Sequence, residues 1–278
     1  MTHKGPIGKN ALVNLYINQK LSMREVGERL DRCGANILYW LREHDIETRV
    51  PNSPGDYQLY KRDELFFDAW SPEMAWVLGL MFADGNVKQA SQNGWSCTLY
   101  SVDVRLLQQV AELIQTGATP RRGTGSAYTL LVGSTLIGRS LVALGCIPAK
   151  SRTMQFPVVP PAYLSHFVRG LWDGDGCIFV RERQRSRTRH GTPNTHRYRE
   201  VTTEYVSGSK CFVAALRDHI REQVEIPTRV RKRQAQYKPF YTISYYHRNS
   251  LRLLSWMYQD SAPQTRLDRK YNLAKEFL

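Results

Sequence analysis

The sequence predicts an α+β fold built from two tandem αββαββα repeats with pseudo-twofold symmetry, preceded by a small all-α unit. A ten-residue segment recurs in register, at 76–85 and again at 167–176, and the same order of elements follows each copy. A chain of 278 residues with 42% hydrophobic content is long enough for two or three units with their own cores. Duplication is therefore the main architectural prediction.

Each recurring segment is expected to be a helix. A proline that suits a first helical turn precedes each copy, at Pro72 and Pro161, and each copy ends in Asp-Gly, where glycine suits a helix C-terminus. In the first repeat (71–155) the helix is followed by strands near 86–90 and 95–101 around Asn93-Gly94, a helix at 102–115, a hairpin at 119–133 and a helix at 134–144. In the second (156–278), strands at 177–189 and 196–207, a helix at 210–223, strands at 228–234 and 239–246, and helices at 250–258 and 267–277 are expected.

Residues 1–50 are expected to form a helix-turn-helix DNA-binding unit, joined by a turn-rich linker at 51–70. Helices are predicted at 10–18, 22–30 and 35–43, and Ser22 and Glu25 form a capping box at the second. The segment 21–42 resembles helix-turn-helix units of bacterial and phage regulators, although Gly34 is a poor helix former at the start of the third helix. The candidate DNA contacts are Arg32, Asn36, Tyr39 and Arg42. The alternative is a helical bundle that only packs against its neighbour.

The charge distribution points to a polyanionic partner. The formal net charge is +14, and residues 151–278 hold 23 of the basic residues against 11 acidic ones. This asymmetry favours nucleic acid over an anionic membrane, with a plain basic soluble protein as the alternative. No apolar run is long enough for a membrane helix, the N-terminus does not resemble a signal peptide, and the five scattered cysteines form no zinc-ribbon pattern. A cytoplasmic protein, encoded by a bacterium or a phage, is expected.

The glycines within the recurring helices indicate that these two helices pack together. Gly79 and Gly170 occupy the same register, and small residues follow four positions later at Ala83 and Gly174. Such packing would bring Asp84 and Asp175 together at two helix C-termini, where like charge and the helix dipole both oppose ionisation. A divalent cation, Mg²⁺ or Mn²⁺, would relieve this conflict. Solvated helix ends are the alternative.

Both segments resemble the LAGLIDADG motif of homing endonucleases, in the two-motif, single-chain form. The resemblance covers about residues 70–278 and rests on 77–85 and 168–176. It implies that the motif helices form the central interface, that Asp84 and Asp175 hold metal with the carbonyls of Ala83 and Gly174, and that a lysine lies near each site. Lys150 and Lys270 match those lysines, to polarise water or neutralise phosphate. Phe82 departs from the motif at a non-essential position, and Arg169 is a further candidate phosphate contact.

Arginines alternate along the predicted strands of the second repeat. A period of two places Arg181, Arg183, Arg185, Arg187 and Arg189 on one face, and the series continues at Arg197 and Arg199 and at Arg229, Arg231 and Arg233. A uniformly cationic face predicts DNA, with base contacts from Gln184, Gln234 and Gln236. The alternative is a basic loop, broken at 192–194. The first repeat offers Lys88, Arg121 and Arg122, with Gln89 and Gln92.

Together these observations predict a monomeric, site-specific endonuclease that makes a double-strand break in a long, non-palindromic DNA target. By resemblance, the break would have short 3′ overhangs and would serve intron or gene homing, and no intein junction pattern is visible. Two alternatives stay open. One is a maturase that binds intron RNA, and the other is a catalytically inactive transcription regulator that keeps the same fold.

Overall fold

The computed structural model describes residues 5–19, 21–48, 62–90, 94–123, 125–189, 192–235 and 238–278, and the side chains of these except 187–189 and 192–194. The chain forms two compact units, Met1–Lys61 and Arg62–Leu278. The predictions for Gln92, Asn93, Gln236 and the segment 51–61 lie outside the described residues. No helix in the described ranges is long and apolar enough to cross a bilayer.

The first unit is a small helical bundle. Helix α1 (Lys9–Leu12) continues into a π-helical turn (Val13–Asn18), and α2 (Met23–Leu30) and α3 (Gly34–Glu43) follow. The capping box at the start of α2 is present, because Ser22 and Glu25 exchange side-chain to backbone hydrogen bonds. The core side chains are Ile7, Leu12, Tyr16, Val26, Ile37, Leu41 and Ile46. Gly27 allows the turn after α2 to close, since a methyl there would lie 2.5 Å from the Arg32 carbonyl.

The second unit contains the first predicted repeat. Its elements are α4 (Pro72–Ala83), β1 (Gly85–Gln89), β2 (Trp95–Ser101), α5 (Val104–Leu113), β3 (Arg121–Arg122), β4 (Tyr128–Gly133) and α6 (Thr135–Ala143). Ser71 caps α4 by accepting from the Met74 amide, with Pro72 in the first turn. The strands form an antiparallel sheet in the order β1-β2-β4-β3.

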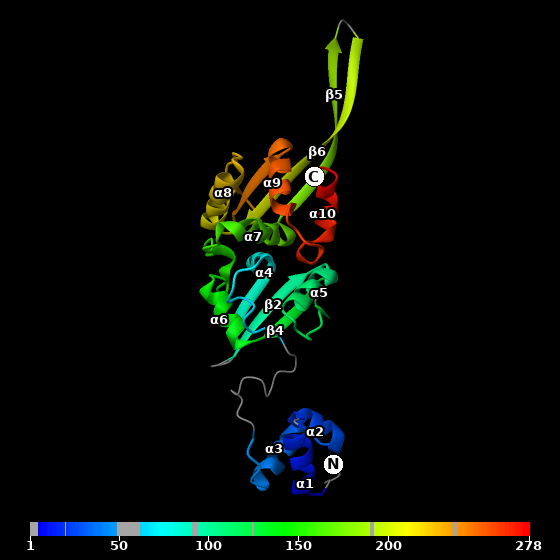
Figure 1. Cartoon of the computed structure of the whole chain (residues 1–278), viewed down its shortest axis with the longest axis vertical. Coiled ribbons are helices and arrows are strands. Elements are labelled where there is room, and N and C mark those ends of the chain that lie inside the picture. Colours follow the sequence, from blue (N-terminus) through cyan, green and yellow to red (C-terminus); the bar gives the residue numbers. More distant parts are fainter. Residues whose placement is uncertain are drawn as a thin grey trace. The chain divides into compact units, whose positions relative to one another are not determined.

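The second repeat has the same order of elements. After a 3₁₀ turn (Lys150–Arg152) come α7 (Pro161–Gly174), β5 (Cys177–Arg189), β6 (Thr192–Ser207), α8 (Lys210–Val224), β7 (Arg231–Arg233), β8 (Phe240–Tyr246), α9 (Arg248–Tyr258), a 3₁₀ turn (Pro263–Thr265) and α10 (Asp268–Lys275). The sheet order, β5-β6-β8-β7, is equivalent to that of the first repeat. The α+β fold with tandem αββαββα repeats is thus confirmed (Figure 1).

Each sheet buries one face and leaves the other open. Helices α5 and α6 contact the first sheet, and α8 and α9 contact the second. On β4 the buried side chains Leu130 and Val132 alternate with Leu131, which is 54% exposed. We call the face without helices the open face of each sheet. Strands β5 and β6 also extend as a long two-stranded ribbon beyond the helical layer (Figure 1).

The structure corrects two boundaries. Residues 62–70, expected to belong to a linker, pack on the first repeat: Phe67 is buried in the main core, and Asp68 accepts a hydrogen bond from Ser140 at 2.7 Å. The compact unit therefore begins at Arg62 rather than at Ser71. The expected break at 192–194 is also absent, because β6 begins at Thr192 and Pro193 pairs with Thr188 at the end of the ribbon.

Candidate active site

The two motif helices, α4 and α7, pack against each other along their glycines. A methyl group on Gly79 would lie 2.9 Å from the Gly170 Cα and closer still to the Phe167 carbonyl oxygen. The reciprocal change at Gly170 would lie 3.0 Å from the Gly79 Cα and closer to the Trp76 carbonyl oxygen. Only glycine allows backbones to approach this closely. The cost of two glycines within helices is therefore offset by a tight, symmetric interface.

This interface brings Asp84 and Asp175 together. Each is the residue that ends its helix, Asp84 after α4 and Asp175 after α7. A methyl group on Gly174 would lie 3.2 Å from the Asp84 Oδ2, so the Asp84 side chain reaches the end of the partner helix. Asp84 is half-buried, and Asp175 is the more exposed of the two. The two matched helix ends therefore form one acidic site.

The surroundings of the two acids oppose their ionisation. Desolvation by the crowded helix ends raises the pKa of Asp175 to about 6, and the negative charge of Asp84 adds to this shift. Desolvation also raises the pKa of Asp84, while Lys270 and Lys150 act in the opposite direction. A carboxylate pair at helix C-termini is an unfavourable arrangement unless a cation is present.

Both predicted lysines lie at the ends of the motif helices, in equivalent places. Lys150 and Lys270 are buried, with 6% and 5% of their surface exposed. Lys150 Nζ donates to the carbonyl of Gly85, and Lys270 Nζ donates to the carbonyl of Gly176 at 2.6 Å. Because Gly85 and Gly176 follow the two aspartates, the two lysines hold the same turn in each repeat. Desolvation lowers the pKa of Lys270.

The donor set suits a hard divalent cation. Asp84 and Asp175 offer carboxylate oxygens, and the helix ends offer the backbone carbonyls of Ala83 and Gly174, which are ligands that Mg²⁺ and Mn²⁺ accept. The Gly174 carbonyl also accepts from Lys270 at 3.0 Å, which uses one of its two lone pairs. In the described ranges no group of three or more His, Cys, Asp or Glu gathers in a way that could hold a metal. The fit therefore rests on the chemistry of the donors, which are two neighbouring carboxylates and the backbone carbonyl oxygens beside them.

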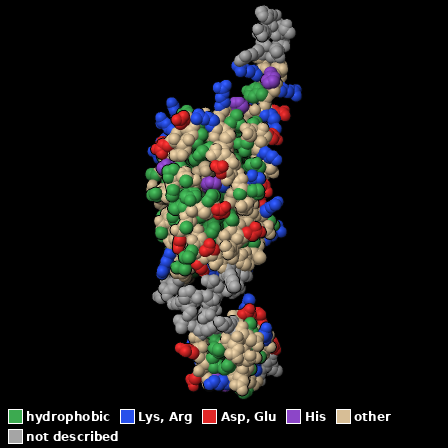
Figure 2. Space-filling view, in the orientation of Figure 1, with side chains coloured by type: hydrophobic (Ala, Val, Ile, Leu, Met, Phe, Trp, Pro, Cys, Tyr) green, Lys and Arg blue, Asp and Glu red, His purple; other side chains and the backbone are tan. Residues whose placement is uncertain are grey.

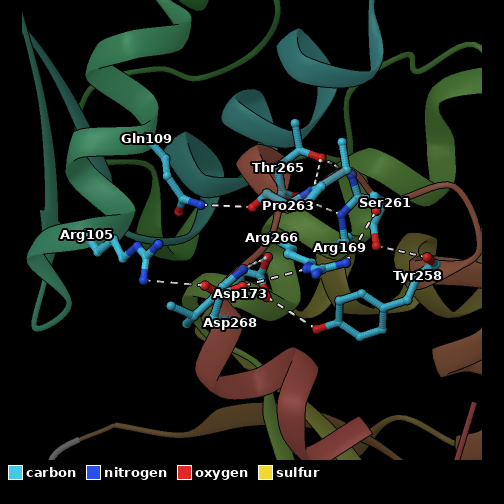
Figure 3. Close-up of polar contacts among 12 residues, drawn as sticks. Arg105, Gln109, Arg169, Asp173, Tyr258, Ser261, Pro263, Thr265, Arg266 and Asp268 are labelled. Carbon is cyan, nitrogen blue, oxygen red and sulfur yellow. Dashed lines mark hydrogen bonds and ion pairs between the residues drawn. The ribbon is translucent and has the colours of Figure 1, made fainter. Parts of the chain in front are cut away.

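The phosphate-binding prediction for Arg169 is wrong. Its side chain is fully buried, and its guanidinium donates to the carbonyl of Thr265 at 2.8 Å (Figure 3). It also donates to the carbonyl of Met257 at 2.8 Å and lies 2.9 Å from His166 Nδ1. Burial lowers the pKa of Arg169 to about 10. Arg169 therefore ties α7 to the C-terminal segment and is not available to DNA.

Asp173 is a residue that the sequence did not single out. It is buried, it accepts from Trp76 Nε1 at 2.9 Å and from the Leu267 amide at 3.1 Å, and desolvation raises the pKa of its carboxyl group. Leu267 starts the turn that leads to Lys270, so Asp173 fixes the approach of that lysine to the site. In the sequence, Arg169 and Asp173 stand four residues apart on one helical face, and this spacing could have indicated that they interact.

The arginine ribbon is not uniformly cationic, and this corrects the sequence prediction. Arg181, Arg183 and Arg185 lie on one face, but their cross-strand partners are Glu200, Tyr198 and His196. Arg183 forms an ion pair with Glu200 at 2.9 Å. Arg197 and Arg199 pair with Gln184 and Glu182 and therefore lie on the opposite face, where Arg199 also contacts Glu276. The face on which each arginine lies therefore follows from the cross-strand register.

The remaining predicted DNA contacts are mostly exposed. Arg231 and Arg233 lie on the same open face as Arg181, whereas Arg229 is exposed just before β7. The described part of the ribbon carries basic side chains (Figure 2). Arg187 and Arg189 belong to β5, but their side chains lie outside the described part. In the first sheet, exposed Lys88 and Arg121 lie on the open face, and exposed Arg122 on β3 points the other way.

The helical unit places its candidates unequally. Arg42 and Tyr39 are exposed on α3, and Asn36 is half-buried. Arg32 donates to the carbonyl of Gly5 at 2.7 Å, so it has a structural partner. Arg42 and Tyr39 are therefore the more accessible of these candidates.

The chain is similar in fold to several solved structures. One, described as mesophilic variants from the homing endonuclease I-DmoI, is 10% identical and has a TM-score of 0.46. The match covers 72% of this chain and 98% of that structure's chain. The I-LtrWI LAGLIDADG homing endonuclease bound to target DNA is 11% identical, with a TM-score of 0.47 and coverage of 77% and 90%. The homing endonuclease I-WcaI bound to its DNA recognition sequence is 10% identical, with a TM-score of 0.45 and coverage of 83% and 96%. No protein-family model matches the chain, and no curated protein matches it.

Proposed function

We propose that the chain is a metal-dependent, site-specific DNA endonuclease of the LAGLIDADG homing type, which makes a double-strand break for intron or gene homing. The observation that carries the proposal is the meeting of Asp84 and Asp175 at the ends of two helices packed through Gly79 and Gly170. A fold with no catalytic task would gain nothing from placing two acids together where burial raises the pKa of both. The motif resemblance of 77–85 and 168–176 agrees with this function.

The chain's own residues divide the work at the site. Asp84 and Asp175 would hold Mg²⁺ or Mn²⁺, together with the carbonyls of Ala83 and Gly174. When bound, such a cation supplies Lewis-acid stabilisation of charge on the scissile phosphate and lowers the pKa of water. Lys150 and Lys270 hold the Gly85 and Gly176 turns that follow the acids, and their positive charge favours phosphate beside the site.

The open faces of the two sheets are the proposed DNA surface. Two-stranded ribbons fit the major groove, and the arginines on the second open face would contact phosphates and guanine edges. The first open face carries fewer cations, so the two half-sites should differ and the target should be non-palindromic. Arg42 and Tyr39 of α3 would extend the contact if the helical unit binds DNA. A single chain carries both repeats, so we propose that it acts as a monomer.

The test is cleavage of long duplex fragments, including the flanks of its own gene, by the full-length protein. Discrete cuts with Mg²⁺ or Mn²⁺, absent with EDTA and absent for the Asp84→Asn, Asp175→Asn double variant, are expected. Arg139→Ala, on the outer side of α6, is the matched surface control and should cut like wild type. Tight binding to one duplex without cutting would favour a transcription regulator, and preference for structured RNA without cutting would favour a maturase. Either result would overturn the nuclease proposal.

A further inference from the structure

The two open faces differ at the row of side chains that stands two residues along the strands from the acids. In the first sheet this row is Asn86, Thr98 and Leu131, which pair across β1, β2 and β4. In the second sheet the matching row is Cys177, Glu204 and Ser244, across β5, β6 and β8. Asn86 and Cys177 each stand two residues after the motif aspartate, so the two rows occupy equivalent places beside the site.

Leu131 is an unusual residue for an open, polar surface. It is 54% exposed on β4, between β2 and β3, and its neighbours on the same face include Thr98 and Thr129. Leu131 cannot form hydrogen bonds with base edges or phosphates. The apolar group that a DNA major groove offers is the C5 methyl of thymine. An exposed leucine on a surface that faces DNA therefore fits that methyl group.

Glu204 lies in the equivalent row of the second sheet and is charged, whereas Leu131 is apolar. Its Oε2 accepts from the Ser244 hydroxyl at 2.6 Å, and within the described residues no cation forms an ion pair with it. Glu200, on the same face, is by contrast paired with Arg183. A carboxylate near phosphates is repelled unless it meets a donor, and the base edge that suits it is the N4 amino group of cytosine.

We propose that these two rows read different bases at matching positions of the two half-sites. Leu131 contacts a thymine methyl group in the half-site under the first sheet, and Glu204 accepts from a cytosine amino group in the half-site under the second sheet. This inference rests on the proposed function, because it takes the open faces as the DNA surface. Ser244 acts as a positioning residue, since its hydrogen bond fixes the Glu204 carboxylate.

The experiment is selection of binding sites by the full-length chain from a pool of random duplexes, in EDTA to prevent cutting. Wild type should enrich one sequence with thymine at one position and cytosine at the matching position of the other half. Leu131→Ala should lose only the thymine preference, and Glu204→Gln only the cytosine preference, each by about tenfold in relative affinity. Leu136→Ala, equally apolar and 47% exposed on α6, and Glu222→Gln on α8 are the matched controls and should select the wild-type sequence.

A second measurement needs no variant. Replacing the selected thymine by deoxyuridine removes only the methyl group, and wild type should bind the resulting duplex about fourfold more weakly. Leu131→Ala should bind both duplexes equally. Equal binding of both by wild type, or a selected site without these two bases, would overturn this inference and leave the endonuclease proposal intact. Enrichment of no sequence would instead overturn site-specific DNA binding, and with it both proposals.

Discussion

The two motif helices share one face and differ on another. Both α4 and α7 present glycines to each other and end in an aspartate. At two equivalent positions on another face, however, the helices differ. Helix α4 has Leu78 and Phe82 where α7 has Arg169 and Asp173. Phe82 packs on the aromatic ring of Phe212, with ring centroids 6.0 Å apart. The charged residues of α7 instead hold the C-terminal segment, from Met257 to Leu267.

This difference explains how the two lysines reach equivalent sites by unequal routes. Lys150 follows α6 closely and lies in a 3₁₀ turn. Lys270 lies beyond α9, and its approach depends on the hydrogen bond from the Leu267 amide to Asp173. The duplicated motif therefore sets the helix interface and the acids, whereas the outer helix face is free to differ. Four predictions probe this comparison, in order of decreasing effect.

Removing the buried acid of α7 should have the largest effect. Asp173→Ala leaves Trp76 Nε1 and the Leu267 amide without an acceptor and deprives buried Arg169 of its countercharge. We expect the free energy of unfolding in urea to fall by about 3–5 kcal/mol. Asp68→Ala, at an exposed acid that also accepts a hydrogen bond, should lose no more than about 0.5 kcal/mol. Similar losses in both variants would mean that the network does not anchor the C-terminal segment.

Adding one methyl group at the shared helix face should have the next largest effect. Gly79→Ala places a Cβ against the backbone of α7, which would force the helices apart and lower the free energy of unfolding by about 1–3 kcal/mol. Gly133→Ala is the control, because the nearest atom to its Cβ would be 4.0 Å away. Thermal and urea unfolding measure both. Wild-type stability in Gly79→Ala would rule out the close approach of the two helices.

The open faces should differ in their salt dependence of DNA binding. Losing Arg181 and Arg185 together should weaken binding and reduce the slope of log K against log salt by about one unit per lost phosphate contact. Lys88→Ala in the first sheet should change the slope by no more than one such unit. Fluorescence anisotropy over a salt series measures this, with Arg139→Ala on α6 as the control. An equal or larger effect of Lys88 would reverse the proposed division between the halves.

The acid pair should make stability depend on pH in the metal-free protein. The pKa of Asp175 is raised to about 6, so the folded state binds this proton more tightly than the unfolded state does. The resulting destabilisation is absent below about pH 4, grows as pH rises, and is complete above about pH 6. Because Asp175 is partly exposed, Asp175→Asn should gain only about 1 kcal/mol at pH 7 and almost nothing at pH 4. Thermal unfolding in EDTA at both pH values tests this, and a constant difference would contradict it.

Local signals made the repeats and the acidic site predictable. The prolines, the Asp-Gly ends and the matched glycines all act within one helix or between two copies of it, so the sequence contains the relevant partners. The two lysines were predictable from the resemblance alone. Their carbonyl partners, Gly85 and Gly176, agree with the symmetry of the repeats.

The errors came from contacts that side-chain patterns do not encode. Arg169 is satisfied by main-chain carbonyls of Met257 and Thr265, and almost any residue type could provide those. The faces of Arg197 and Arg199 follow from the pairing register of a long ribbon, which a period of two within one strand cannot give. Residues 62–70 lack a clear period, yet Phe67 is buried in the core and Phe66 and Trp70 pack against it.

The central claim is that Asp84 and Asp175 together form the centre that cuts both DNA strands. It is tested most directly on a supercoiled plasmid that carries the selected target. With Mg²⁺, wild type should yield linear DNA. Asp84→Asn and Asp175→Asn should each yield at most nicked circles, and the double variant should bind the target without cutting either strand. Linear product at the wild-type rate from either single variant, or from wild type in EDTA, would contradict the account.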